Sequence, residues 1–303
     1  MSNRRLRCVV VLVCFICCSG PGRSRVLLQW SAEPGERRTY SALLGSTPDS
    51  LGRKIEASGL RDLLPNPPDA SSPEGRGFYQ GLHQDIRRLE IPSSLPSLLT
   101  LEGKARGSLE LRLRGKDPGP PPGPEATALD RQAYRFRQRE SRMFQLRALL
   151  SNRGDVLSFY LSQQQKNIPQ LIFQLPMAPV KVGDRWPLAT QLITASSRYV
   201  HKDSSRIGEA QLVLLETRPT GERVAGVTFV AAERYEGIAD LPDGRTDVAF
   251  RIEATYVAYG ELLLESGVWD PYVGELTQGS AGLGPEPTVK RDLYLLRPLP
   301  TGG

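Results

Sequence analysis

Histidine and cysteine are scarce in this sequence. All four cysteines lie within the first 18 residues, and His83 and His201 are the two histidines among 303 residues. The sequence contains no HExxH, GxSxG, GxxxxGK or GxGxxG motif. These motifs are the usual signatures of zinc peptidases, serine hydrolases and nucleotide-binding loops. We therefore expect none of these activities, no metal site and no cofactor.

Long apolar runs are equally rare. The one unbroken run covers residues 8–18 (CVVVLVCFICC), after three arginines and before Ser19 and Gly20. A basic start, a short apolar core and small residues are the layout of a secretory signal peptide. The run is shorter than the roughly 20 residues that a membrane-spanning helix needs. We predict a signal peptide over residues 1–22 and an exported protein, in the periplasm, the cell envelope or the exterior.

The position of the cysteines allows a second outcome, lipidation at Cys17 or Cys18. A lipoprotein signal places a small residue directly before the modified cysteine, but Ile16 precedes Cys17, and Cys17 precedes Cys18. Plain cleavage near Ser19 or Gly22 is therefore favoured. The mature chain would then carry no thiol, which excludes disulfides, thiolate metal sites and cysteine nucleophiles.

The net charge of +6 arises mostly at the N-terminus, where five arginines precede the first acidic residue, Glu33. The rest of the chain is close to neutral, so we expect no nucleic-acid partner, and membrane contact only through the signal peptide or lipidation. Residues 130–147 form a basic segment in which arginines alternate with Tyr134 and Phe136. We interpret it as the solvated face of a strand or helix rather than an anion-binding surface.

Turn residues are abundant, with 29 glycines and 25 prolines, and they favour short strands over long helices. Short apolar runs separated by tight turns predict an antiparallel meander in the second half. The expected strands are residues 188–201, 207–217, 223–235, 247–258, 260–266, 274–278 and 289–296, with a crossover at 268–274.

The first half, residues 26–168, is expected to be irregular and β-rich, with proline-rich loops at 65–77 and 117–124. Residues 26–30 and 38–44 flank the turn at Pro34-Gly35 and predict an opening hairpin that pairs Trp30 with Tyr40. Residues 146–150 and 156–163 predict a second hairpin, whose turn accounts for the Arg153-Gly154-Asp155 tripeptide without an integrin-binding role. Helical spacing favours short helices at 55–64 and 78–91.

Residues 170–188, QLIFQLPMAPVKVGDRWPL, join this half to the meander at 169–299. The two halves form either two domains or one. We interpret this segment as an architectural anchor, in which Asp184 orders a turn and Trp186 packs in the core. The motif residues are Leu175, Pro176, Val182, Gly183, Asp184 and Trp186.

These residues, with the Pro-Gly-Glu turn before Tyr40, resemble an uncharacterised family of exported bacterial proteins that carry an LP…VGDxW element. The resemblance implies no established activity. Its strand-rich layout is also similar to the half-barrels of periplasmic lipoprotein carriers, an analogy of architecture alone.

The predicted fold is mainly β: a curved antiparallel meander or half-barrel with one or two short helices and proline-rich loops, with a two-sheet sandwich as the alternative. The favoured function is that of an exported, non-enzymatic protein that binds a lipid or other apolar ligand in the concavity of the sheet, or assists surface assembly. The alternative is a carboxylate-dependent hydrolase, for which Asp184, Glu265 and Asp270 are nominal candidates. We assign no catalytic residue.

Overall fold

A computed structural model describes residues 25–300 except 47–48, 65, 93–94, 118, 143, 160–166, 194–198, 242–243 and 285. The predicted signal peptide and both lipidation candidates lie outside the described residues. Within the described ranges, no helix is both long and apolar enough to cross a bilayer.

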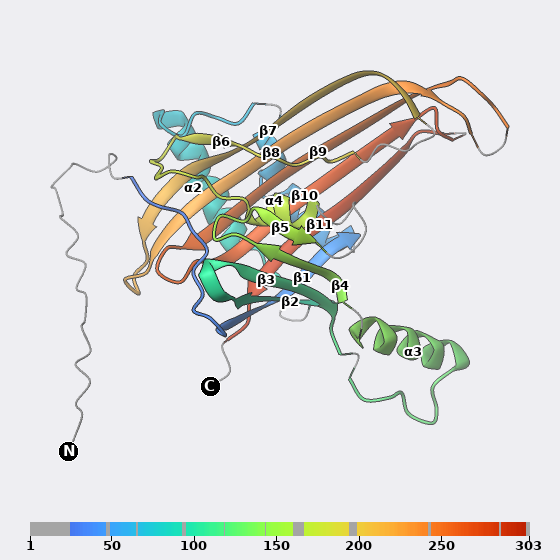
Figure 1. The fold of residues 1–303 in the computed structure, drawn as a ribbon, viewed down its shortest axis with the longest axis horizontal. Coiled ribbons are helices and arrows are strands. Elements are labelled where there is room, and N and C mark those ends of the chain that lie inside the picture. The colour runs from blue at the N-terminus through green and yellow to red at the C-terminus, as the bar shows by residue number, and fades with distance from the viewer. Residues whose placement is uncertain are drawn as a thin grey trace.

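Within the described residues, eleven antiparallel strands form one open, curved sheet in the order β5-β4-β3-β2-β1-β11-β10-β9-β8-β7-β6 (Figure 1). The mainly β, antiparallel meander fold is therefore confirmed, as a single sheet rather than a two-sheet sandwich. The strands are β1 (Arg37–Ser46), β2 (Ser97–Gly103), β3 (Leu109–Gly115), β4 (Phe144–Leu150), β5 (Val156–Phe159), β6 (Arg185–Pro187), β7 (Tyr199–Thr217), β8 (Arg223–Ala239), β9 (Val248–Leu263), β10 (Val268–Ala281) and β11 (Thr288–Pro298).

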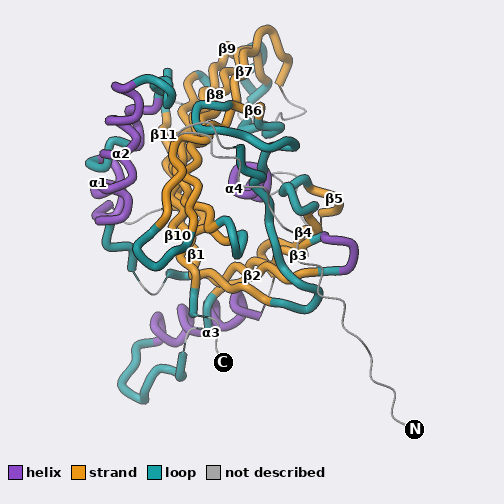
Figure 2. The backbone as a smooth tube through the Cα atoms, turned by 90° about the vertical axis from the view of Figure 1, so that its left-hand side faces the viewer, coloured by secondary structure: helices purple, strands orange, loops and turns teal. Residues whose placement is uncertain are grey.

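The sheet joins two meanders through the first and last strands. Tyr40 of β1 pairs with Pro298 of β11, and Ser46 pairs with Asp292. The chain between β5 and β6 must therefore pass from one edge of the sheet to the other. Helix α4 (Asn167–Phe173) lies in this connection, on the concave side of the sheet (Figure 2).

The other helices lie elsewhere. Figure 2 shows α1 (Asp49–Glu56) and α2 (Pro73–Arg88) on the convex face, whereas α3 (Ala128–Arg142) projects near the first strands. Two 3₁₀ turns, η1 (Leu60–Leu63) and η2 (Ala105–Gly107), complete the described helical elements. The helix expected at 78–91 is confirmed within α2, whereas residues 55–64 contain only the end of α1, a turn and η1. The basic segment adds α3, whose alternating residues had suggested a strand equally well.

The concave face carries the larger apolar core. Trp30, Trp186 and Trp269 are buried in it together with Phe173 of α4 and several buried tyrosines. The second core lies on the convex face, where Tyr79, Leu82 and Ile86 of α2 pack against residues of β7–β11 such as Val257. Strands β1 and β7–β11 contribute residues to both cores, so each is covered on both faces over part of its length.

The predicted opening hairpin is wrong. The turn forms, because Gly35 adopts a φ of 85° and Glu36 N donates to Glu33 O at 2.8 Å, but β1 pairs with β2 and β11 instead. Residues 26–30 leave the sheet and bond to distant loops: Val26 bridges Val180, and Trp30 N donates to Asn152 O at 2.9 Å. The apolar run beside the turn thus indicated a buried segment without identifying its partner.

Two predicted strand breaks are also wrong. Their glycines lie within strands and form no turn; the missing side chain leaves room for a tyrosine of the neighbouring strand. Gly260 lies inside β9, where an added Cβ would come within 2.7 Å of the Tyr272 ring. Gly274 lies inside β10, beneath the Tyr256 hydroxyl. Residues 188–193, in contrast, form no strand and cross the concave face, where Glu233 accepts hydrogen bonds from Leu192 N and Ile193 N.

The second hairpin is confirmed, since β4 and β5 pair around Gly154 and Ser151 N donates to Asp155 O at 2.9 Å. Its arginine holds the crossover connection in place. Arg153 Nη1 donates to Pro176 O at 2.5 Å and to Leu28 O at 3.3 Å. An added Cβ on Gly154 would overlap Phe173 O, so the glycine is required by the close approach of α4.

The C-terminal carbonyls of α4 accept hydrogen bonds from three aromatic side chains. Trp30 Nε1 donates to Phe173 O at 2.7 Å, Trp269 Nε1 donates to Ile172 O at 3.0 Å, and the Tyr272 hydroxyl donates to Leu171 O at 3.0 Å. The last four carbonyls of a helix lack intrahelical partners and are costly to bury unpaired. The aromatic core of the sheet therefore also caps the crossover helix.

We expect Trp269→Phe to lower the free energy of unfolding by about 2 kcal/mol more than Trp186→Phe, measured by urea denaturation. Both variants lose the same ring volume from the core. Only the first leaves a buried carbonyl unpaired, because Trp186 Nε1 has no hydrogen-bond partner among the described residues. Equal losses in the two variants would show that the indole hydrogen bond to α4 contributes nothing measurable.

Candidate functional site

Helix α2 carries His83 to the convex face of the sheet. The helix begins at Pro73, and the side chain of Ser72 caps it by accepting a hydrogen bond from Gly75 N at 2.9 Å. Tyr79 and His83 are four residues apart and both buried, so they lie on the same face of the helix. This face packs on β7–β10 and aims the imidazole at β9.

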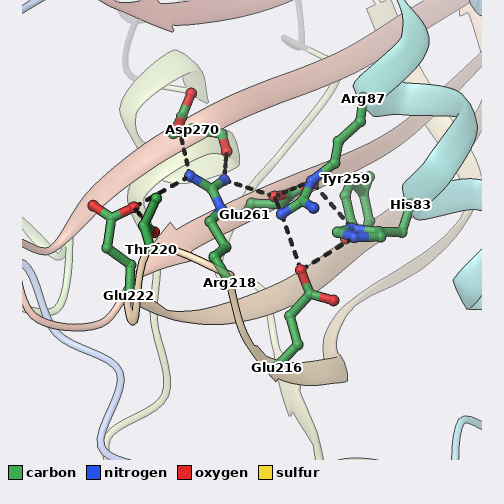
Figure 3. Close-up of polar contacts among 9 residues, drawn as sticks. All are labelled: His83, Arg87, Glu216, Arg218, Thr220, Glu222, Tyr259, Glu261 and Asp270. Carbon is green, nitrogen blue, oxygen red and sulfur yellow. Dashed lines mark hydrogen bonds and ion pairs between the residues drawn. The ribbon is translucent and has the colours of Figure 1, made fainter.

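Glu261 of β9 lies at the centre of a cluster of charged side chains beneath α2 (Figure 3). Its side chain is completely buried. Arg87 Nη2 lies 2.8 Å from Glu261 Oε2, Arg218 Nη2 lies 3.0 Å from the same oxygen, and His83 Nδ1 lies 3.0 Å from Oε1. A buried carboxylate is thereby surrounded by two guanidinium groups and an imidazole.

His83 connects this carboxylate to two further groups. Its Nδ1 lies 2.8 Å from the hydroxyl of Tyr259, and its Nε2 lies 3.3 Å from Glu216 Oε1 (Figure 3). Arg87 Nη2 also contacts Glu216 Oε1, at 2.9 Å. The helix is therefore tied to β7 and β9 through polar contacts in the midst of an apolar interface.

Arg218 extends the cluster to β10. It follows β7 in the turn before β8, and its Nη1 and Nη2 donate to Asp270 Oδ2 at 2.9 Å and to Asp270 O at 2.8 Å. The register between β9 and β10 shifts between Trp269 and Tyr272. This irregularity places Asp270 beside the neighbouring turn, because a bulge redirects the side chains of its strand.

The charge states of the cluster follow from its contacts. Burial acts to raise the pKa of Glu261, but hydrogen bonds from His83, Arg87 and Arg218 outweigh it and hold the pKa below the ordinary value. Burial raises the pKa of Tyr259 well above its usual range. Glu261 is thus an anion and Tyr259 a neutral phenol at neutral pH. A carboxylate held in its ionised form is a poor general acid.

A cleft of about 540 Å³ lies directly beside this cluster. Its wall combines apolar side chains from the end of α2 with charged groups of the sheet. The lining residues are Ile86, Arg87, Leu89, Glu90, Ile91, Arg218, Asp270, Pro271 and Arg297.

Three of the predicted motif residues form a turn that lies away from this cleft. Gly183 adopts a φ of 95°, and Gly183 N donates to Leu212 O at 2.8 Å. The Asp184 carboxylate accepts a hydrogen bond from Lys181 N at 3.1 Å, and the buried Trp186 pairs with Ala210 of β7. These contacts belong to the edge of the sheet.

Two further motif residues, Leu175 and Pro176, contact the β4–β5 turn, where Leu175 N donates to Arg153 O at 2.8 Å. The sixth, Val182, is partly buried and packs against both apolar cores. Asp270 is the one nominal carboxylate that the structure brings into the cluster. Glu265 lies exposed in the turn after β9, where it accepts from Arg223 N at 3.1 Å. His201 lies near the start of β7, at the end of the strand remote from Arg218, and pairs with Gly237 of β8.

Sequence reasoning missed Glu261, Arg87, Arg218 and Glu216, and it assigned no role to His83. One signal was available for Glu261, which interrupts the apolar run VAYGELLL of residues 257–264. A carboxylate inside a buried strand needs a cationic partner. The partners come from α2 and from the β7–β8 turn, and no spacing rule connects such distant segments.

Among the described residues, no group of three or more histidine, cysteine, aspartate and glutamate side chains is arranged to hold a metal ion. Comparisons with protein-family models, with curated proteins and with solved structures find no match to this chain. The resemblance to exported bacterial proteins therefore stays a prediction.

We expect Glu261→Gln to lower the free energy of unfolding by about 3 kcal/mol, measured by urea denaturation. The substitution leaves Arg87 and Arg218 without the carboxylate that they share. Glu222→Gln is the matched control, because its exposed carboxylate lies 3.8 Å from Arg218 and should contribute less than about 1 kcal/mol. Equal effects of the two substitutions would contradict a central role for Glu261.

The stability gained from Glu261 should also depend on pH. Since its folded pKa lies below the unfolded value of about 4.3, the ionised group stabilises the fold above that pH, and the contribution is lost as the pH falls toward the folded pKa. We expect the difference in unfolding free energy between wild type and Glu261→Gln to be constant above about pH 6 and to shrink below pH 4. A difference that grows on acidification would reverse the assigned sign.

Proposed function

We propose that this protein is an exported, non-enzymatic binding protein, and that its ligand is a small amphiphilic anion held in the cleft beside α2. The proposal rests above all on Arg297, a cation that lines the cleft beside apolar residues and forms no ion pair with a described carboxylate. The export part of the proposal rests on the signal-like sequence at residues 1–22. Assistance in surface assembly would be compatible with such a role.

Arg297 is the lining cation that remains available to a ligand. Its Nη1 donates to Ile91 O at 2.9 Å, and no described carboxylate forms an ion pair with it. Arg87 and Arg218, in contrast, are occupied by Glu261. The acidic lining residues Glu90 and Asp270 have cationic partners of their own, at 3.2 Å from Lys54 and 2.9 Å from Arg218.

The apolar part of the wall is suited to a hydrocarbon group. Ile86 and Leu89 of the α2 end, Ile91 after it and Pro271 of the β10 bulge line the cleft. A cleft of a few hundred Å³ that combines apolar walls with placed polar groups is typical of small-molecule binding. Guanidinium groups bind carboxylate and phosphate oxygens through paired hydrogen bonds.

The concave face, where the sequence suggested an apolar ligand, is a poorer candidate. Trp30, Trp186 and Trp269 are buried there in one cluster, and α4 packs against it. The Trp30 and Trp269 rings lie edge to face with centroids 5.3 Å apart. Such packing leaves the centre of the concavity occupied by the protein's own side chains, so we locate the ligand on the opposite face.

The alternative of a carboxylate-dependent hydrolase has one observation in its favour, the contact of His83 with Glu261 near a cleft. The surroundings oppose it, because Glu261 is completely buried and both of its oxygens are occupied. A dyad that must exchange protons with a substrate needs access to the substrate. We therefore favour binding without turnover.

We expect octanoate and octyl phosphate to bind the wild-type protein, and Arg297→Gln to weaken this binding at least about tenfold, measured by isothermal titration calorimetry. Octyl glucoside, which has the same chain without a charge, should bind weakly to both. Arg291→Gln is the matched control, because Arg291 is an exposed arginine on the same strand that does not line the cleft. Native mass spectrometry of the purified protein would identify a natural ligand directly.

Equal affinity of octyl phosphate for wild type and Arg297→Gln would overturn the proposed site. Hydrolysis of nitrophenyl octanoate or octyl phosphate by the wild type, lost in a folded His83→Gln variant, would favour the hydrolase instead. Absence of binding by all three probes, with no co-purified ligand, would also count against the proposal.

A further inference from the structure

Helix α3 projects from the body of the protein at the end of the sheet where β3 and β4 lie (Figure 1). It follows the proline-rich segment 117–124 and leads directly into β4. Among the described elements, it packs mainly against β3 and β4. The helix is therefore mostly surrounded by solvent, although its sequence contains a leucine and a phenylalanine. It also contains five arginines.

Local capping explains why these residues form a helix. Asp130 N donates to Thr127 Oγ1 at 3.1 Å, and the Asp130 carboxylate accepts from Thr127 N at 2.9 Å. This reciprocal pair is a capping box, a signal for the start of a helix in the sequence Thr-Ala-Leu-Asp. Arg131 Nη2 donates to Ala126 O at 2.8 Å and fixes the entry of the chain. The helix is thus specified by its own residues.

The two sides of α3 differ in what they contact. Tyr134, Gln138 and Ser141 are half-buried on the inner side, and the Tyr134 hydroxyl donates to Gly119 O at 3.2 Å. Leu129 is 74% exposed and Phe136 is 65% exposed. Because these two residues are seven apart, they lie on one face of the helix, turned away from Tyr134. An apolar ridge therefore faces solvent.

Arginines flank this ridge. Arg135 and Arg139 are exposed, lie four residues apart, and form no ion pair with any described carboxylate. Exposed apolar residues combined with arginines on one amphipathic helix are the features by which a helix lies in a membrane interface, with the guanidinium groups near lipid phosphates. The ridge projects from the protein and is not a groove, so it suits a broad, flat partner better than a peptide.

We propose that α3 docks the protein reversibly onto the surface of an anionic lipid bilayer, with Leu129 and Phe136 in the headgroup region and Arg135 and Arg139 against lipid phosphates. This inference extends the sequence-based expectation, which confined membrane contact to the N-terminus. It is independent of the ligand proposed for the cleft. Two apolar side chains and a few charges give weak binding that depends on salt.

The test is co-sedimentation of the protein without residues 1–22 with lipid vesicles. We expect binding to mixed phosphatidylglycerol and phosphatidylcholine vesicles at low salt, weaker binding at about 0.5 M NaCl, and little binding to phosphatidylcholine alone. Leu129→Ser with Phe136→Ser should lower the partition coefficient at least about tenfold. Arg135→Glu with Arg139→Glu should have an effect of similar size.

The matched control is Val289→Ser with Arg291→Glu. Val289 is 69% exposed, and Arg291 is an exposed arginine on the same strand, so the control removes the same chemistry from another part of the surface. It should bind vesicles as the wild type does. Circular dichroism and thermal unfolding should show native folds in all three variants.

Two results would overturn the proposal. The first is that the wild type does not bind anionic vesicles at low salt, or that the α3 variants bind as well as the control. The second is self-association: if light scattering shows a dimer that Leu129→Ser with Phe136→Ser dissolves, and vesicles bind neither form, then the ridge serves a second copy of this chain.

Discussion

The burial of α4 on the concave face constrains the rest of the fold. A connection from one edge of a curved sheet to the other has to place backbone polar groups over an apolar surface, where unpaired carbonyls are costly. Trp30, Trp269 and Tyr272 satisfy the carbonyls of residues 171–173 while their rings fill the curve of the sheet. The same side chains thus provide both the core and the cap, so the crossover and the curvature depend on each other.

On the convex face, ion pairs connect the covering helices to the sheet. On the concave face, hydrogen bonds from aromatic side chains connect α4 to the sheet. Glu261 of β9 binds Arg87 of α2, and Glu275 of β10 forms two hydrogen bonds of 2.9 Å with Arg61 of η1. Each carboxylate is buried in a sheet face that would otherwise accept a helix in several registers. Since a buried carboxylate is satisfied in only one arrangement, we infer that these pairs fix where α2 and η1 lie.

The sequence predicted the class of fold, since strand periodicity and turn residues are local signals. The β4–β5 hairpin is an example, because Gly154 and its neighbours determine the turn themselves. Nonlocal features were missed or misassigned. Residues 26–30 form an apolar run like that of a strand yet pair with loops. Gly260 looks like a strand break yet leaves room for an aromatic ring. In both cases the deciding partner comes from a distant segment that periodicity does not identify.

The candidate site was still less accessible to sequence reasoning, for the same reason. Asp270 could be named only as one carboxylate among many, because the arginine that binds it follows β7 and the bulge that turns it lies in β10.

The coverage of both sheet faces also has a consequence for function. When α4 fills the concavity and α1 and α2 cover the convex side, the surfaces left for partners are those where this cover ends. The cleft lies where α2 ends beside the sheet, and α3 projects beyond the sheet altogether, so the two proposed contacts arise where the fold no longer buries its own residues.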